Sequence, residues 1–196
     1  MTKSQDISLK AVFLSLVVIL TLLGNTIRFG PFSITLSLTP IIIASAIFGP
    51  HDGAIFGAVF GAVVLLSGVL GMDGGTTMFL MGQNLPAVIA ICLIKGIVAG
   101  FVAGLTYKAF SKKNDTLAVV LAGIICPVVN TGLFILGMII FFMSTLQSWA
   151  NGEKVIYYII FGLTGINFLI ELTVNIVLSS ITSRLIRYRI KSKKIQ

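Results

Sequence analysis

The chain has 196 residues, of which 57% are hydrophobic and only 10% are charged, and its net charge is +8. Soluble domains carry about 25% charged residues, so this composition excludes an ordinary soluble enzyme or nucleotide-binding domain and indicates an integral membrane protein. The positive charge indicates membrane topology and not a nucleic-acid partner, because the basic residues cluster near both termini and in one turn.

Long apolar runs separated by polar or basic turns predict an all-α protein in which residues 1–196 form a single membrane domain. At ~20 residues per span, the chain has room for about six transmembrane helices. No small-x-small cleavage site follows the first run, which is therefore predicted to be a membrane helix and not a signal peptide. The predicted helices cover, in chain order, residues 9–23, 34–48, 53–70, 87–110, 117–142 and 155–184.

The distribution of lysine and arginine predicts that both termini are cytoplasmic. Basic residues gather before the first helix, in the turn between the fourth and fifth helices, and in the C-terminal tail. An excess of such residues marks the cytoplasmic side of a membrane protein. The polar loops 24–33, 71–86 and 143–154 then lie outside. Longer polar loops on one face of a bundle are where binding groups tend to lie, so the outer face is the expected working face.

Two charged residues, Lys95 and Glu171, lie deep within predicted membrane helices. A charge at the centre of such a helix costs roughly 2.5–3.5 kcal/mol on insertion scales, so these residues need a reason to be there. Asn130 lies near the middle of the fifth helix, and Asn167 precedes Glu171 by one helical turn. One interpretation is a structural Lys95–Glu171 ion pair. The other is a pocket for a small polar or anionic solute, with Lys95 as its positive pole.

Glycines recur every fourth residue in the third and fourth predicted helices, at Gly53, Gly57, Gly61, Gly96, Gly100 and Gly104. This spacing aligns small residues on one helix face, where another helix can approach closely. The rows predict internal packing, with a docking face for another membrane subunit as the alternative. Cys92 and Cys126 have no metal-ligand spacing, and no metal or other cofactor is predicted.

Several short segments resemble the substrate-binding S components of energy-coupling factor (ECF) transporters, and most of all their pantothenate-type branch. The segments read FGPFSIT at 29–35, PIIIA at 40–44, FGP at 48–50 and GAIFG at 53–57. Asn130-Thr131 and the row formed by Asn167, Glu171 and Asn175 are also similar to that branch. The branch tends to have arginine where this chain has Lys95. Lysine keeps the positive charge of arginine, but it lacks the planar guanidinium that can donate two parallel hydrogen bonds to one carboxylate.

The resemblance implies a six-helix, multi-pass protein of the bacterial cell membrane that captures a vitamin at its outer side. It also implies partnership with a membrane coupling subunit and two cytoplasmic ATPase subunits, and no catalytic activity. S components often use a pair of alanines on the first helix to pack on the coupling subunit. That pattern falls on Ala11 and Ser15 here.

The expected ligand is a small anion, with pantothenate as the best single candidate. Its carboxylate suits Lys95, and its hydroxyl and amide groups suit the neighbouring amides and hydroxyls. The alternatives are another vitamin, such as riboflavin, folate or a thiamine precursor, or a role as a membrane-embedded enzyme or assembly factor. The predicted substrate-binding residues are Lys95, Asn130, Asn167, Glu171, Asn84, Thr77 and Arg28.

Overall fold

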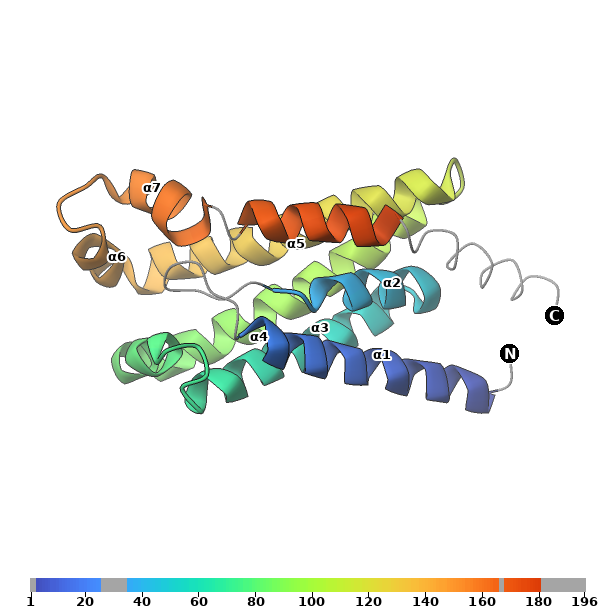
Figure 1. Cartoon of the computed structure of the whole chain (residues 1–196), viewed down its shortest axis with the longest axis horizontal. Helices are drawn as coiled ribbons and strands as arrows, with labels where there is room; N and C mark the ends of the chain where they lie inside the picture. Colours follow the sequence, from blue (N-terminus) through green and yellow to red (C-terminus); the bar gives the residue numbers. More distant parts are fainter. Residues whose placement is uncertain (1–2, 26–34, 166–167, 181–196) are drawn as a thin grey trace.

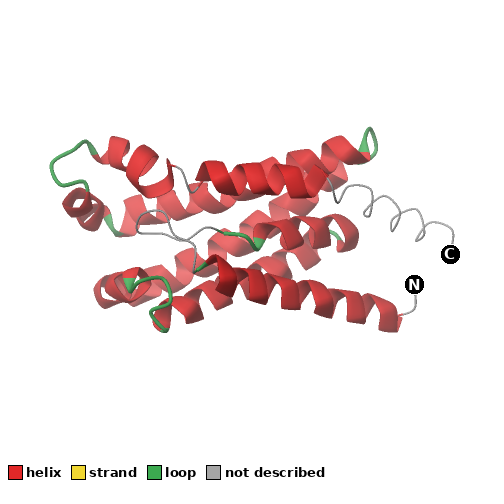
Figure 2. Cartoon of the chain, viewed as in Figure 1, coloured by secondary structure: helices red, strands yellow, loops and turns green. Residues whose placement is uncertain are grey.

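The computed structural model describes residues 3–25, 35–165 and 168–180, and in these ranges it contains helices and no strand (Figure 2). The predicted all-α class is therefore confirmed. A π-helical segment, η1 (Tyr158–Thr164), continues the last labelled helix, and a further apolar helix covers Phe168–Ser180. The labelled helices are α1 (Lys3–Gly24), α2 (Leu38–Phe48), α3 (Pro50–Val69), α4 (Thr76–Phe110), α5 (Asp115–Phe141), α6 (Met143–Trp149) and α7 (Val155–Tyr157).

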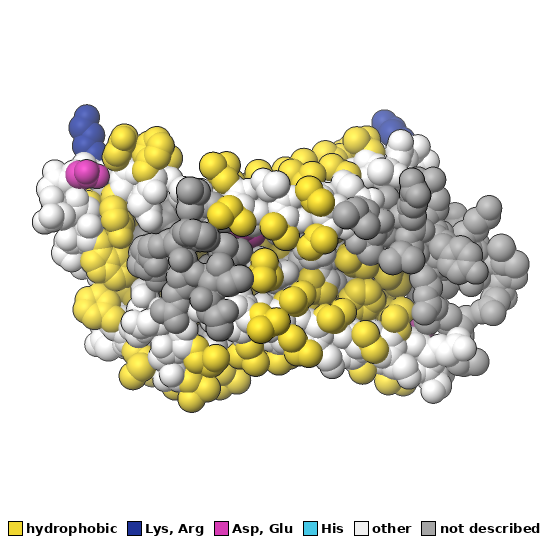
Figure 3. All heavy atoms as spheres, in the orientation of Figure 1, with side chains coloured by type: hydrophobic (Ala, Val, Ile, Leu, Met, Phe, Trp, Pro, Cys, Tyr) yellow, Lys and Arg dark blue, Asp and Glu magenta, His cyan; other side chains and the backbone are white. Residues whose placement is uncertain are grey.

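The helices form an elongated bundle, and several of its described connections lie at its two ends (Figure 1). One end holds the beginning of α1, the α2–α3 connection and the α4–α5 turn, and the other holds the α3–α4 turn and α6. An ion pair joins Lys10 of α1 to Asp52 of α3 at 2.6 Å, which fixes the beginning of α1 beside the α2–α3 connection. On the face shown in Figure 3, hydrophobic side chains cover much of the described surface between the two ends.

Within the described ranges, four helices are long and apolar enough to cross a bilayer: α1 from Ser4, α3, α4 and α5. By contrast, α2 has 11 residues. At 1.5 Å per residue that is about 16 Å, roughly half of the ~30 Å hydrocarbon core. Most of its residues are buried, so α2 lies within the bundle, against α3, α4 and α5. The predicted span 155–184 is divided among α7, η1 and the helix Phe168–Ser180, as far as it is described.

The prediction of a loop over residues 71–86 is wrong for most of that range, because α4 begins at Thr76. The carboxylate of Asp73 accepts hydrogen bonds from the backbone N–H groups of Gly75 and Thr77 and so caps the first turn. The helix is broken at Asn84, where φ is −154° and ψ is 85°. Pro86 explains the break, because it cannot donate a backbone hydrogen bond and restricts the preceding residues. Pro86 and the polar residues of this segment have the composition of a loop, which is why its sequence predicts one.

The third predicted helix also begins earlier than expected, at Pro50 instead of Gly53. Proline is favoured at the first helical position because its missing N–H needs no partner there. Gly49, with φ at +106°, makes the connection from α2 by itself. Such a backbone conformation is open to glycine and strained for other residues.

The two glycine rows pack against each other and hold α3 and α4 in backbone contact. A Cβ added at Gly57 would overlap the carbonyl group of Gly96, and one at Gly53 would overlap the carbonyl oxygen of Gly100. The internal-packing interpretation of these rows is thus confirmed. The close approach fixes the position of α4 and therefore of Lys95.

Candidate binding site

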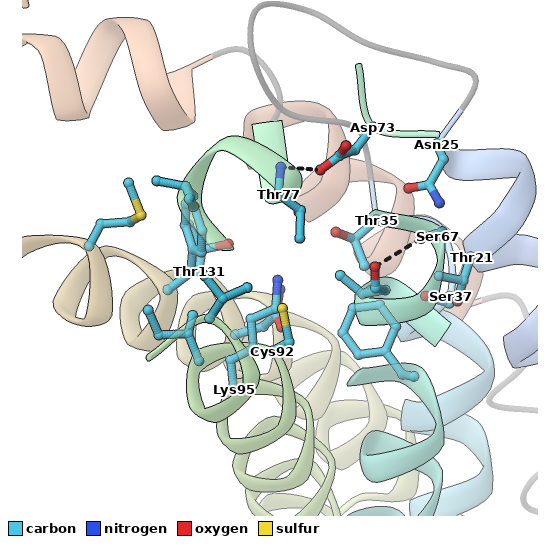
Figure 4. A pocket seen from close by; sticks show the side chains of 18 of the residues that line it. Thr21, Asn25, Thr35, Ser37, Ser67, Asp73, Thr77, Cys92, Lys95 and Thr131 are labelled. Carbon is cyan, nitrogen blue, oxygen red and sulfur yellow. Dashed lines mark hydrogen bonds between the residues drawn. The ribbon is translucent and has the colours of Figure 1, made fainter. Parts of the chain in front are cut away.

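A cavity of about 130 Å³ lies among α1, α2, α3, α4, α5 and the helix Phe168–Ser180. In Figure 4, Lys95 and Cys92 lie on one wall, Thr35 and Ser37 lie across from them, and Asp73 and Thr77 are at the side of the α3–α4 turn. The cavity therefore lies toward the end of the bundle that was predicted to face outside. Its polar and charged lining residues are Thr21, Asn25, Thr35, Ser37, Ser67, Asp73, Thr77, Lys95, Asn130, Thr131 and Glu171.

The structure brings four of the predicted binding residues to this one cavity: Lys95, Asn130, Glu171 and Thr77. They come from α4, α5, the last described helix and the first turn of α4. Asn84 is not among the lining residues. Its side-chain oxygen instead accepts a hydrogen bond from the N–H of Ala87, at the break in α4. Arg28 and Asn167 lie outside the described residues.

The ammonium of Lys95 lies against two aromatic rings. Its Nζ is 5.2 Å from the centroid of Phe134 and 5.8 Å from that of Phe60. These distances are within the ~6 Å range of cation–π attraction. Among the described residues, the only ion pair within 4 Å joins Lys10 and Asp52. The Lys95–Glu171 ion pair considered from the sequence is therefore not formed.

Glu171 is 5% exposed and lies in a separate hydrogen-bonding group. The hydroxyl and backbone N–H of Thr35 hydrogen-bond to its carboxylate. One turn later, Asn175 donates to the backbone carbonyl of Glu171 at 2.7 Å and accepts from the hydroxyl of Thr39 at 2.9 Å. These bonds join the last described helix to α2 and to the residues just before it. Oε1 of Glu171 and Oδ1 of Asn130 have no hydrogen-bond partner among the residues that the structure describes.

Several lining residues were not predicted from the sequence. The hydroxyls of Thr21 and Ser67 donate hydrogen bonds to the backbone carbonyls of Val17 and Val64 in their own helices. A serine or threonine in any apolar helix can make such a bond, so it does not by itself indicate a binding site. Isolated serines and threonines in apolar runs were the available signal, but others, such as Ser15 and Thr173, are exposed and line no cavity. Phe60 and Phe134 gave no signal, because phenylalanine is common in membrane helices.

Ala11 and Ser15, the predicted docking residues, lie on an exposed face of α1. The hydroxyl of Ser15 donates to the carbonyl of Ala11 at 3.0 Å, so the polar group is satisfied within the helix. Large apolar side chains are exposed around them, including Val12 and Ile19. A face of this kind suits lipid or another membrane helix.

The chemistry of the cavity is that of binding. It presents one ammonium, two carboxylates, two amides, several hydroxyls, and an aromatic and aliphatic wall. The described residues contain no group of three or more His, Cys, Asp or Glu side chains placed to hold a metal ion. His51 lies beside Phe101 near the α2–α3 connection and is not part of the cavity lining. A concave apolar pocket with a few converging polar groups is typical of a small-molecule site.

Comparisons with known proteins agree with this description. The profile of the family described as "ECF transporter, substrate-specific component" matches residues 5–183. The chain is also similar to the pantothenic acid transporter PanT of Lactococcus lactis subsp. cremoris (strain MG1363). The two are 26% identical over 191 residues, which cover 91% of this chain and 92% of that protein.

Proposed function

The chain belongs to the family of ECF transporter substrate-specific components, and from that premise we propose that it captures pantothenate at the outer side of the membrane. The family consists of transporter components and not of enzymes, which removes the membrane-enzyme alternative. Together with the long apolar helices, it makes the chain a multi-pass protein of the cell membrane.

The observation that carries the choice of ligand is the position of Lys95. It is the only lysine or arginine that lines the described cavity, and no carboxylate in the described part of the chain lies within 4 Å of its ammonium. An ammonium in a partly apolar pocket attracts an anion strongly, because a charge-assisted hydrogen bond is about twice as strong as a neutral one. Pantothenate has one carboxylate, and the similarity to PanT supports the same choice.

The remaining polar groups suit the other end of such a ligand. Asn130, Thr131 and Thr77 offer amide and hydroxyl groups on other parts of the cavity lining. Pantothenate carries two hydroxyls and an amide, each of which needs a partner when it leaves water. Arg28 and Asn167 are proposed to complete the site from segments outside the described residues.

Transport itself requires partner subunits. We propose that the chain spans the membrane with six helical segments and both termini in the cytoplasm. It associates with a membrane coupling subunit through the face of α1 that contains Ala11 and Ser15. Two cytoplasmic ATPases supply the energy for uptake.

Calorimetric titration of the purified protein with pantothenate and with its alcohol analogue tests the proposal. The two probes share hydroxyls and amide and differ in the carboxylate. We expect pantothenate to bind about 10- to 100-fold more tightly, which corresponds to about 1.5–3 kcal/mol for a hydrogen bond to a charged group. Equal affinities, or binding of neither probe, would reject pantothenate as the ligand.

A further inference from the structure

We infer that Phe60 and Phe134 are positioning residues that hold the Lys95 ammonium toward the cavity in place of a counter-ion, and so set the preference of the site for a carboxylate over a neutral group. This inference rests on the proposed function and deepens it. Neither phenylalanine is needed for the assignment to the family, and neither carries a signal in the sequence.

The geometry places the two rings on the helices that flank Lys95. Phe60 belongs to α3 and Phe134 to α5, while Lys95 is on α4 between them in the chain. Both rings line the same cavity as the lysine, and both lie within 6 Å of its Nζ. Gly96, the residue after Lys95, makes room for one of them. A Cβ at that position would lie 3.1 Å from Cδ1 of Phe60.

The two carboxylates in the described cavity lining have other partners. Glu171 receives hydrogen bonds from Thr35, and Asp73 receives them from the N–H groups of Gly75 and Thr77 at the first turn of α4. Neither lies within 4 Å of the Lys95 ammonium. A carboxylate held against the lysine would have to be displaced before an anionic ligand could bind.

Aromatic faces attract an ammonium without using its N–H donors in hydrogen bonds, as a carboxylate would. The ring quadrupole supplies a negative face, but it accepts no strong hydrogen bond. The N–H groups of Lys95 therefore stay available to a ligand, while the flexible lysine stem is held in one position. A side chain that is already ordered loses less conformational entropy when a ligand binds. This raises the affinity for a ligand that contacts the ammonium, and leaves the affinity for other ligands unchanged.

The test compares two probes on four proteins. Dissociation constants for pantothenate and for its alcohol analogue are measured by calorimetry on the wild type, Phe134→Leu, Phe134→Tyr and Phe168→Leu. Leucine keeps an apolar side chain but removes the ring, whereas tyrosine keeps the ring. Phe168→Leu is the matched control, because Phe168 lines the cavity without a cation–π contact to Lys95.

We expect Phe134→Leu to weaken pantothenate binding by about 3- to 30-fold, as loss of a cation–π contact implies. Binding of the alcohol analogue should change by less than about twofold, because that probe makes no ion pair with Lys95. Phe134→Tyr should restore the wild-type ratio of the two constants, and Phe168→Leu should leave the ratio unchanged.

Four outcomes would overturn the inference. Equal losses for both probes in Phe134→Leu would show that the ring only packs. A ratio lowered as much in Phe168→Leu would show that any loss of a cavity phenylalanine has the effect. If the wild type bound neither probe, the proposed ligand would fail and the inference with it. A wild type that prefers pantothenate, with an unchanged ratio in Phe134→Leu, would reject the inference alone.

Discussion

At the scale of single residues, Lys95 places a positive charge within a membrane helix, where a charge is energetically unfavourable. A lysine far from either end of a membrane helix is unfavourable unless the protein supplies a compensating environment. Here the environment consists of two aromatic rings and a polar cavity instead of a carboxylate. Residues kept at such a cost mark functional sites more often than structural ones. The absence of a Lys95–Glu171 pair strengthens that interpretation, since the lysine does not hold two helices together.

Replacing Lys95 with methionine should remove the preference for an anion and leave the fold intact. Methionine keeps the length of the side chain and its contact with the rings, but it cannot donate to a carboxylate. We expect pantothenate affinity to fall about 10- to 100-fold, with a melting temperature close to that of the wild type. Lys108→Met, in the last turn of α4, is the control and should bind normally.

Calorimetry and thermal unfolding in detergent separate the two possible causes of a loss. If Lys95→Met bound pantothenate as tightly as the wild type, the lysine would not belong to the site. If the variant unfolded well below the wild-type melting temperature, a structural role would be indicated instead.

At the scale of secondary-structure elements, the contact between α3 and α4 determines the geometry of the cavity. Gly57 and Gly96 allow the two backbones to meet, and the same helices carry Phe60 and Lys95 one turn or less away. Without a strong hydrophobic force between helices in lipid, such close packing is a main source of stability. The glycine rows therefore support both the fold and the site.

Gly57→Ala should destabilise the protein, because its Cβ would overlap the backbone of Gly96. Overpacking of this kind typically costs 1–3 kcal/mol, which corresponds to a fall in melting temperature of about 2–10 °C for a chain of this size. Gly82→Ala is the matched control, since nothing lies within 4 Å of a Cβ there. Its melting temperature should stay the same or rise, because alanine favours a helix. Equal melting temperatures for the two variants would contradict a tight α3–α4 contact.

The exposed face of α1 is the second element with a specific expectation. Ala11→Trp combined with Ser15→Trp should block co-purification with the coupling subunit, because two large rings prevent close approach of another helix. Binding of pantothenate to the isolated chain should survive, since neither residue lines the cavity. Leu16→Trp, at another exposed position of α1, is the control and should assemble normally. Normal assembly of the double variant would place the coupling interface on a different surface.

At the scale of the whole molecule, charge and connectivity agree on one orientation. Lys10, Lys112 and Lys113 lie at the end of the bundle with the α2–α3 connection and the α4–α5 turn, while the cavity lies toward the other end. The positive-inside rule therefore predicts that the first end faces the cytoplasm and that the cavity opens to the outside.

Labelling with a membrane-impermeant maleimide tests this orientation. Cys92 and Cys126 are both buried and would first be replaced by alanine. Glu153→Cys, at an exposed position between α6 and α7, should react in intact cells. Lys113→Cys, exposed in the α4–α5 turn, should react only after the cells are broken. The reverse pattern would invert the topology, and reaction of both in intact cells would contradict the crossing of α5.

The isolated chain should bind its ligand without concentrating it. In liposomes, the protein alone should show no uphill uptake of labelled pantothenate, because it has no phosphate-binding loop with which to use ATP. Addition of the coupling subunit, the two ATPases and ATP should start uptake. Sustained accumulation by the chain alone would contradict the proposed dependence on partners.

Composition and pattern were enough to predict much of this protein. The apolar runs gave the all-α membrane class, and the glycine spacing gave the α3–α4 contact, because both depend on local periodicity along one chain. Lys95, Asn130 and Glu171 were found for a related reason. A polar residue within an apolar helix is visible without any knowledge of its neighbours, since its cost arises from the membrane itself.

Only the tertiary structure decided what surrounds these residues. Whether Lys95 meets Glu171 or the rings of Phe60 and Phe134 depends on rotations and depths of helices that no sequence spacing fixes. In the segment beginning at Thr76, Pro86 favours a loop by local preference, whereas the hydrogen bond from Thr77 N–H to Asp73 and the contacts with α6 favour a helix. The sequence by itself determined which groups are costly to bury. The packing of the helices determined which groups meet, because that choice depends on contacts between distant parts of the chain.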